Sequence, residues 1–182
     1  NFLITYHPVT HEKSYGINNF KVLLKVLEKL KHTSIIFTMP NSDIKNNVFY
    51  LEIKKFIKKN KNSKYFNSLG RKRYFSCIAH SDLVIGNSSS GIIEVPSFKK
   101  PTLNLGIRQN GRIGAKSIIN CESVSKKNIL NSLKKIQSVK FKKDLKSIKN
   151  PYEKLNTSSQ IIKILKKITN EQEINKVFFD QQ

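Results

Sequence analysis

The clearest fold signal in this chain is the sequence Asp-Leu-Val-Ile-Gly-Asn-Ser-Ser-Ser-Gly at residues 82–91. Residues 82–86 form a short apolar run, which predicts a buried β-strand. The turn that follows is rich in hydroxyl groups and bounded by glycines, and the apolar residues beyond it predict a helix over residues 91–98. A strand that leads through such a turn into a helix is the repeating unit of parallel α/β sheets.

The rest of the chain repeats this alternation of short apolar runs and longer helical patterns. Further strands are predicted at residues 2–6, 34–39 and 101–105, with weaker ones at 64–66 and 116–120. Further helices are predicted at residues 17–31, 46–59, 72–80, 125–137 and 158–168, with Ser125 and Thr157 as N-caps. The Lys- and Ser-rich segment 138–157, which contains Pro151, is predicted to be an irregular linker.

This alternation predicts an α/β fold, a Rossmann-like parallel sheet flanked by helices. We expect one such domain over residues 1–157, followed by a C-terminal helix and tail over residues 158–182. A length of 182 residues with 38% hydrophobic content is enough for one folded domain with a substantial core.

The formal net charge is +22, from 34 Lys and Arg against 12 Asp and Glu. Such an excess is compatible with a polyanionic partner, but it is mostly lysine on the polar faces of predicted helices. The chain also lacks the interleaving of aromatic and basic residues that single-strand binders use. A solvated lysine surface is therefore the favoured interpretation, and a nucleic-acid partner is disfavoured.

The cysteine pattern indicates a reduced, cytoplasmic compartment. Cys77 and Cys121 lie far apart and have no metal-ligand spacing around them, so we expect neither a disulfide framework nor a metal site. No apolar run approaches the roughly 18 to 20 residues that cross a bilayer, so no membrane partner is expected. The chain starts without Met in a predicted strand, which we interpret as a fragment of a longer protein.

Two loops after predicted strands carry polar groups at the edge of the sheet where ligands bind in open α/β folds. His7 ends the first strand and is held by Pro8, so it is placed to contact a phosphate or a leaving group; the alternative is a turn histidine bonded to the main chain. Asn41 and Asp43 follow the second strand, either as ligand-binding groups or as ordinary turn and cap residues.

The turn after the strand at 82–86 is the strongest candidate site. Ser88, Ser89, Ser90 and Gly91 place hydroxyls and main-chain N–H groups at the positive end of the predicted helix, which suits a pyrophosphate. Glu94 lies one turn into that helix, where its carboxylate can accept hydrogen bonds from a ribose diol. An ordinary strand-to-helix turn is the alternative. Neither a P-loop nor a dinucleotide-binding fingerprint is present, and we expect no cofactor.

Two further loops complete the set of candidates. Arg108 and Arg112 lie in a glycine-containing loop, at residues 106–112, after the strand at 101–105. If that strand neighbours the one at 82–86, the two arginines give phosphate a charged fork; exposed surface residues are the alternative. Leu69, within Ser-Leu-Gly-Arg at residues 68–71, offers main-chain groups to a base or belongs to a plain connection.

Taken together and in order, these loops resemble the C-terminal half of the hydrolysing UDP-N-acetylglucosamine 2-epimerases of the sialic and legionaminic acid pathways of bacteria. The resemblance covers residues 2 to about 168. It rests on His-Pro-Val-Thr at 7–10, Pro-Asn-Ser-Asp at 40–43, Ala-His at 79–80 followed by Ile-Gly-Asn-Ser-Ser-Ser-Gly at 85–91, Glu-Val at 94–95, and Asn-Leu-Gly-Ile-Arg-Gln-Asn-Gly-Arg at 104–112. Non-hydrolysing relatives differ after the histidine and in the last loop, which favours the hydrolysing branch.

The resemblance implies two Rossmann-like domains of the glycosyltransferase-B type, with UDP held mainly by the C-terminal one. Carried over by position, the implied contacts are His7 and Arg108 with the diphosphate region, Ser88 and Ser89 with the phosphates, Glu94 with the ribose, Asn41 with the substrate side of the cleft, and the Leu69 main chain with the uracil. His7 is the single candidate catalytic residue within this chain.

The implied reaction is abstraction of the proton at sugar C2, anti elimination of UDP and hydration of the resulting glucal, which yields N-acetylmannosamine. The expected partners are UDP, a UDP-amino sugar and an N-terminal domain of the same protein that carries the acid and base carboxylates, with a homo-oligomer at full length. The alternatives are an epimerase for a UDP-diacetamido-trideoxy sugar and a nucleotide-binding module without activity.

Overall fold

The computed structural model describes residues 1–10, 12–39 and 46–167. Within them lies one six-stranded sheet in the order β3-β2-β1-β4-β5-β6, and every pairing is parallel. The strands are β1 (Phe2–Thr5), β2 (Ile35–Thr38), β3 (Ser63–Phe66), β4 (Leu83–Gly86), β5 (Thr102–Leu105) and β6 (Ile118–Cys121). This order is that of the Rossmann fold, and it confirms the predicted parallel sheet, including its two weaker strands.

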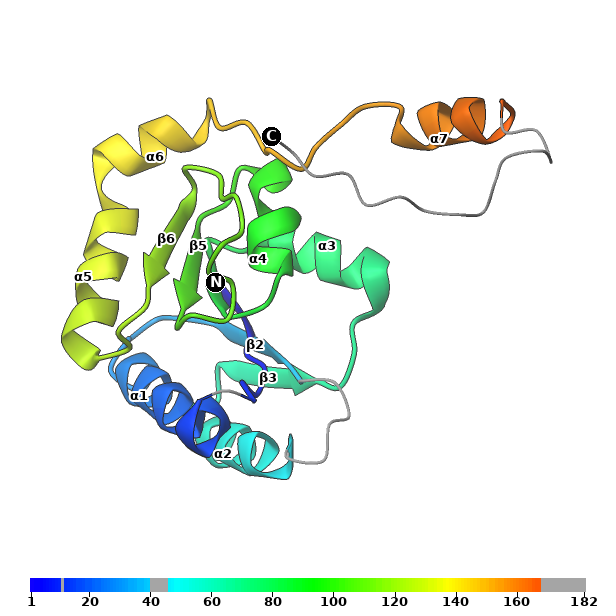
Figure 1. Ribbon diagram of the computed structural model, residues 1–182. Coiled ribbons are helices and arrows are strands. Elements are labelled where there is room, and N and C mark those ends of the chain that lie inside the picture. The colour runs from blue at the N-terminus through cyan, green and yellow to red at the C-terminus, as the bar shows by residue number, and fades with distance from the viewer. Residues whose placement is uncertain (11, 40–45, 168–182) are drawn as a thin grey trace. The chain divides into compact units, whose positions relative to one another are not determined.

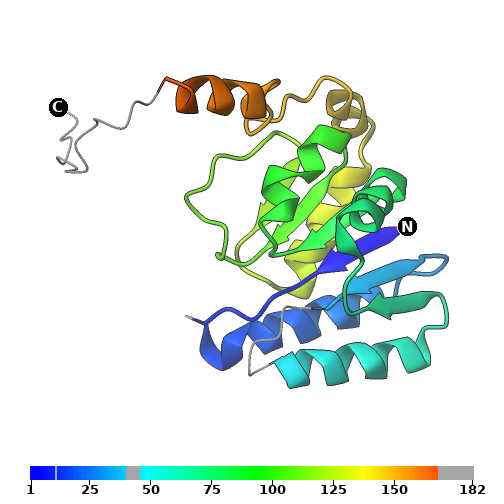
Figure 2. The same cartoon turned by 90° about the vertical axis from the view of Figure 1, so that its right-hand side faces the viewer.

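Helices cover both faces of the sheet (Figures 1 and 2). On one face lie α1 (Ile17–Leu27), α2 (Asn46–Lys59) and α5 (Lys126–Gln137), and a short helix, α6 (Val139–Leu145), follows α5. On the other face lie α3 (Gly70–His80), α4 (Ser90–Ile93) and a 3-10 turn at Val95–Phe98. A second 3-10 turn, Lys13–Gly16, precedes α1.

The core is split by the sheet, because successive side chains of a strand point to opposite faces. Ile4 and Ile85, neighbours in register, belong to the larger cluster under α1, α2 and α5. Leu3 and Val84, the pair before them, belong to a smaller cluster with Ile78 of α3. Because both faces of the central strands are covered, these strands read as continuous apolar runs, which is typical of parallel sheets.

Two predicted helical segments differ from the structure. The helix expected at residues 91–98 is broken into α4 and the 3-10 turn, because Pro96 lacks an N–H and disfavours helical geometry at Val95. The segment 138–157, predicted to be irregular, contains α6, whose N-cap Ser138 accepts a hydrogen bond from Phe141 N at 3.3 Å.

The two predicted N-caps have different outcomes. Ser125 caps α5 by accepting a hydrogen bond from Asn128 N at 3.1 Å, as predicted. Thr157 is the first residue of α7 rather than its cap, since Asn156 holds the cap position with a left-handed backbone, φ 60°. The prediction for Thr157 was therefore wrong by one residue.

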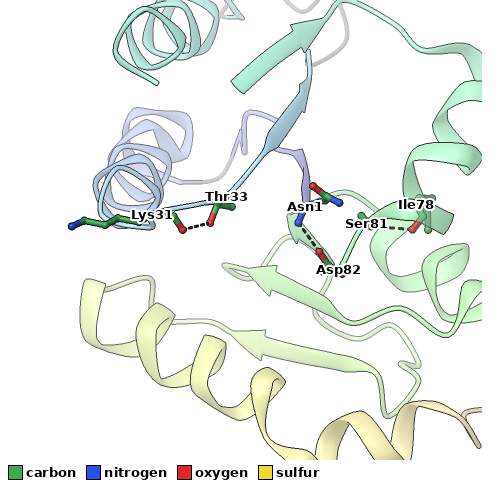
Figure 3. Close-up of polar contacts among 6 residues, drawn as sticks. All are labelled: Asn1, Lys31, Thr33, Ile78, Ser81 and Asp82. Carbon is green, nitrogen blue, oxygen red and sulfur yellow. Dashed lines mark hydrogen bonds and ion pairs between the residues drawn. The ribbon is translucent and has the colours of Figure 1, made fainter. Parts of the chain in front are cut away.

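Polar contacts lie at the amino ends of β1, β2 and β4 (Figure 3). Asp82 N donates to Asn1 O at 2.8 Å, which aligns the starts of β4 and β1. The Ser81 hydroxyl donates to Ile78 O at 2.9 Å at the end of α3, and the Thr33 hydroxyl donates to the carbonyl oxygen of Lys31 at 3.3 Å before β2. As a result β1 and β4 also end level, with Thr5 opposite Gly86.

The chain divides into two compact units, Asn1–Tyr152 and Glu153–Gln182. Of the second, the structure describes residues 153–167, with α7 (Thr157–Leu165) and its exposed Ile161, Ile162, Ile164 and Leu165. Among the helices described, none combines the length and the apolar character that crossing a membrane requires.

Candidate functional site

The sheet changes its direction of winding at β1, which has β2 on one side and β4 on the other. The chain moves outward from β1 to β3 and then returns to β4. The connections that leave the carboxyl ends of β1 and β4 therefore run in opposite directions along the sheet. Ligands of open α/β sheets bind in the crevice at such a point. His7 follows β1 and the serine turn, residues 86–91, follows β4, so the structure brings these two predicted loops together.

Gly86 allows the first strand and the serine turn to approach this closely. Its backbone has φ +149°, and a Cβ atom built there stands 1.8 Å from the Thr5 carbonyl oxygen. Any side chain at this position collides with the main chain of β1, so the turn requires glycine.

Asn87 connects the serine turn to His7. The His7 main-chain N–H donates to Asn87 Oδ1 at 2.7 Å, and Asn87 Nδ2 donates to the His7 carbonyl oxygen at 2.8 Å. The Asn87 side chain is fully buried. The loop after β1 is therefore tied to the loop after β4 by two hydrogen bonds.

Arg108 lies beside the same turn. Its Nη1 donates to the Asn87 carbonyl oxygen at 3.0 Å, and Gln109 Nε2 donates to that oxygen at 2.8 Å. This placement follows from the pairing of β4 with β5, the condition on which the predicted phosphate fork depended. Arg108 and Arg112 are both exposed, and the Arg112 main-chain N–H donates to Gln109 O at 3.2 Å. Among the described residues no hydrogen bond joins the Arg112 guanidinium to the turn, so the structure brings one arginine of the predicted fork to the site.

The three serines of the turn are half-buried, and two of their hydroxyls have defined partners. Tyr74 donates to Ser90 Oγ at 2.9 Å, and Ser88 Oγ accepts a longer bond, 3.4 Å, from Ser90 N. The N–H groups of Gly91 and Ile92 donate to the carbonyls of Ser88 and Ser89. These two N–H groups are therefore engaged within the turn and α4, and the Arg108 guanidinium adds positive charge beside them.

Gly91 faces β5. A Cβ atom on it stands 2.8 Å from Thr102 Cγ2, and the Thr102 hydroxyl donates to the Gly91 carbonyl oxygen at 2.8 Å. The absence of a side chain at Gly91 lets the serine turn pack directly on the neighbouring strand.

A pocket of about 360 Å³ opens beside these loops, a size within the range of small-molecule sites. It brings together three of the predicted residues, His7, Leu69 and Glu94. The remaining lining residues come from β1, β2, the loop before α3 and α3 itself: Thr5, Thr38, Met39, Asn67, Ser68, Gly70, Arg71, Tyr74 and Phe75. Asn41 and Asp43 lie outside the described residues.

Tyr74 is a neutral donor at the wall of this pocket. Burial raises the pKa of its phenol above the usual value, and the nearby charge of Glu94 adds to that rise. The pKa of Tyr6, the residue that directly follows β1, is raised chiefly by burial and then by Glu12. Both phenols therefore stay protonated at neutral pH and donate hydrogen bonds.

The sequence did not single out Asn87, Gln109 or Tyr74. Asn87 stood within the quoted turn, but its role depends on main-chain groups 80 residues away. Gln109 is 6% exposed, and its Oε1 is buried without a hydrogen-bond partner in the part of the chain that the structure describes. The contacts of Asn87 and Gln109 leave no local pattern in the sequence.

A family model described as UDP-N-acetylglucosamine 2-epimerase matches residues 1–166, nearly the whole chain. The chain belongs to this family. The match confirms the resemblance inferred from the five motifs, and an epimerase family is thereby established.

Three curated proteins are similar to this chain in sequence. A protein of Campylobacter jejuni named GDP/UDP-N,N'-diacetylbacillosamine 2-epimerase (hydrolyzing) is 39% identical over 145 residues, which are 79% of this chain and 37% of that protein. Polysialic acid biosynthesis protein P7 of Escherichia coli is 34% identical over 166 residues, 91% of this chain and 42% of that protein. UDP-N-acetylglucosamine 2-epimerase of Neisseria meningitidis is 31% identical over 146 residues, 76% of this chain and 36% of that protein. The chain thus spans less than half the length of these relatives.

Solved structures of family members share the fold. A Staphylococcus aureus structure titled as a complex of MnaA with UDP has a TM-score of 0.68 at 16% identity, over 91% of this chain and 44% of that one. The Neisseria meningitidis UDP-GlcNAc 2-epimerase bound to UDP-GlcNAc has a TM-score of 0.66 at 20% identity, over 92% of this chain and 44% of that one. The Rossmann-like sheet is therefore that of the C-terminal half of a glycosyltransferase-B type fold.

Proposed function

We propose that this chain is the nucleotide-sugar-binding part of a hydrolysing UDP-N-acetylglucosamine 2-epimerase. The observation that carries the proposal is the placement of Arg108, bonded to the Asn87 carbonyl beside three serines, at the switch point of the sheet. A fixed guanidinium and hydroxyls beside a pocket form a site for an anionic ligand. Glu94 and Leu69, on the wall of that pocket, supply an acceptor for ribose hydroxyls and main-chain groups for uracil.

In the proposed reaction a base removes the proton from C2 of the sugar, and the electron pair of that C–H bond forms the C1–C2 double bond. The C1–O bond breaks on the opposite face and UDP leaves with its electron pair. Water then adds across the double bond, with the hydroxyl at C1 and a proton at C2, and gives N-acetylmannosamine. Negative charge grows on the departing diphosphate, where Arg108, Ser88 and Ser89 stabilise it.

His7 has a separate role in this proposal. Its main chain is held against Asn87, so its side chain starts from a fixed point at the mouth of the pocket. We assign it to the diphosphate region as a contact to the leaving group. The acid and base carboxylates are assigned to an N-terminal domain of the same protein, so the chain by itself binds nucleotide and does not turn over substrate.

A second candidate substrate is a UDP-linked diacetamido-trideoxy sugar. The specific observation in its favour is the 39% identity to a relative named for diacetylbacillosamine, the highest identity among the three relatives described above. The nucleotide half of the site is the same in both cases. The two candidates differ at the sugar ring, which the N-terminal domain is expected to contact.

The nucleotide assignment is tested by thermal shift and calorimetry of this chain with UDP, UDP-N-acetylglucosamine, GDP and ADP. A ligand at a hundred times its dissociation constant stabilises the folded state by about 2.7 kcal/mol, so we expect a clear rise in melting temperature with UDP. An equal response to ADP removes the uridine assignment. A preference for GDP moves the assignment to guanosine, and steep salt-dependent binding of RNA without a response to UDP supports a nucleic-acid protein instead.

The choice between the two sugars is tested with the full-length protein. The protein is supplied with each UDP-sugar in turn in D2O. From its true substrate we expect it to release UDP and the epimerised free sugar, which carries solvent deuterium at C2. Retention of the C2 proton, or release of UDP without epimerisation, contradicts the elimination mechanism.

A further inference from the structure

Asn87 uses both of its main-chain groups and both of its side-chain groups in hydrogen bonds. Its side-chain amide pairs with the N–H and C=O of His7, at 2.7 and 2.8 Å. Its main-chain N–H donates to Thr5 O at 3.3 Å, and its carbonyl oxygen accepts from Arg108 and Gln109. One fully buried residue therefore joins the loops that follow β1, β4 and β5.

The main chain of His7 needs such a partner. The parallel ladder between β1 and β4 ends at the pair Thr5 and Gly86, so no strand continues beside His7. Pro8 has no N–H and holds the residue before it in an extended conformation. The amide of Asn87 carries a donor and an acceptor side by side, as a peptide group does, and so completes both bonds where the ladder stops. His7 is half-buried, so loss of these two bonds would be destabilising to the extent that water does not replace them.

The same residue fixes a positive charge. The bond to the Asn87 carbonyl engages one of the five N–H donors of the Arg108 guanidinium. Among the described residues, no ion pair is formed by Arg108. Its charge is therefore held at the serine turn without a carboxylate to neutralise it, which is the arrangement that a bound anion requires.

We propose that Asn87 is a positioning residue that holds the His7 loop and the Arg108 guanidinium in one arrangement facing the diphosphate. This inference rests on the proposed function, because it concerns the same nucleotide. It goes further by assigning the geometry of the phosphate half of the site to one residue that does not itself need to touch the ligand.

The proposal separates the two halves of the nucleotide. The groups assigned to uracil belong to the loop at residues 68–71, which makes no hydrogen bond to Asn87 within the described parts of the chain. Loss of the Asn87 amide is therefore expected to weaken the hold on the diphosphate and to leave the hold on uridine unchanged. A residue that only stabilised the fold would weaken both together.

The test compares Asn87→Ser with Asn120→Ser. Serine keeps a polar side chain at residue 87 but is too short to reach both groups of His7. Asn120, which is exposed, is the control for loss of an amide hydrogen bond away from the site, because it accepts a side-chain bond from Asn104 at 2.9 Å between β5 and β6 and does not line the pocket. Dissociation constants for UDP and for uridine are measured on each chain by NMR titration, together with amide exchange at His7.

For Asn87→Ser we expect UDP affinity to fall about tenfold, uridine affinity to change less than about twofold, and the His7 amide to lose its protection from exchange. Asn120→Ser keeps the parent's ratio of the two affinities. If Asn87→Ser keeps the parent's ratio of UDP affinity to uridine affinity, whether or not both affinities fall, the proposal is overturned. Binding of UDP by the parent would still support the proposed function in that case.

The unaltered chain provides a second measurement in case Asn87→Ser does not fold. UDP is expected to shift the resonances of the Asn87 side-chain amide and the His7 N–H more than uridine does. Equal shifts with the two ligands overturn the proposal. A parent chain that binds neither ligand refutes the proposed function itself, which distinguishes the two failures.

Discussion

Tyr74 of α3 donates a hydrogen bond to Ser90 Oγ at 2.9 Å, and so joins a helix that lines the pocket to the serine turn. Burial raises the pKa of Tyr74 above its usual value, with the charge of Glu94 contributing. A phenol that keeps its proton keeps this bond. The hydrogen bond between Tyr74 and Ser90 is therefore lost only when alkaline pH removes the proton of the phenol.

The first prediction concerns stability above pH 10. Because the pKa of Tyr74 is higher in the folded chain than in the unfolded chain, the folded chain binds more protons there, and its free energy of unfolding falls as pH rises above about 10. Each such group contributes a slope of at most about 1.4 kcal/mol per pH unit. Urea unfolding of the parent and of Tyr74→Phe between pH 9 and 11 measures this slope, and we expect it to be smaller in the variant. Tyr152→Phe, at an exposed site, is the control and should keep the parental slope.

The second prediction concerns Gly86. A Cβ atom there stands 1.8 Å from the main chain of β1, so Gly86→Ala must separate the two strands at the switch point. We expect a loss of about 4 kcal/mol in the free energy of unfolding, or failure to fold. Gly114→Ala is the matched control, because its Cβ atom meets only the Ile118 side chain at 3.4 Å. Similar urea midpoints for the two variants would contradict this account of the turn.

The fold was predictable because the features that define it are local. Four-residue apolar runs such as Leu83–Gly86 alternate with amphipathic helices such as α2, whose predicted bounds match the structure. The pairing of β4 with β5 follows from topology rules for such alternation. The end of α4 was also encoded locally, in Pro96, but the apolar periodicity across residues 91–98 outweighed it in the prediction.

The site was predictable only in part, for a physical reason. Residues such as Glu94 and Leu69 stand at the ends of elements, and topology alone gathers them at one pocket. The roles of Asn87 and Gln109 depend instead on main-chain groups contributed by distant loops, with partners 80 and 22 residues away. Side-chain to main-chain bonds of this kind leave no periodic pattern, so they emerge only from the structure.

The third prediction concerns the arginine loop. Arg108→Gln removes the charge held at the serine turn, and we expect UDP affinity to fall about tenfold to a hundredfold by calorimetry. Arg112→Gln removes an equal charge from the same loop, and the structure predicts less than about a twofold change. If the two variants lose affinity equally, the second arginine does join the fork expected from the sequence. If neither loses affinity, Arg108 does not contact the diphosphate.

The fourth prediction concerns the ribose. Glu94 lines the pocket with Leu69 and Tyr74, and its carboxylate is assigned to the ribose hydroxyls. The parent chain is therefore expected to bind UDP more tightly than 2'-deoxy-UDP, and Glu94→Gln is expected to bind the two within about twofold of each other, because a neutral amide accepts weaker hydrogen bonds than a carboxylate. Glu122→Gln, at an exposed residue after β6, removes the same charge and should retain the parent's preference. Competition titrations with the two nucleotides give the ratio directly. A parent chain that does not distinguish them shows that Glu94 faces some other group of the ligand, whereas a preference that survives in Glu94→Gln assigns the ribose to another residue of the pocket.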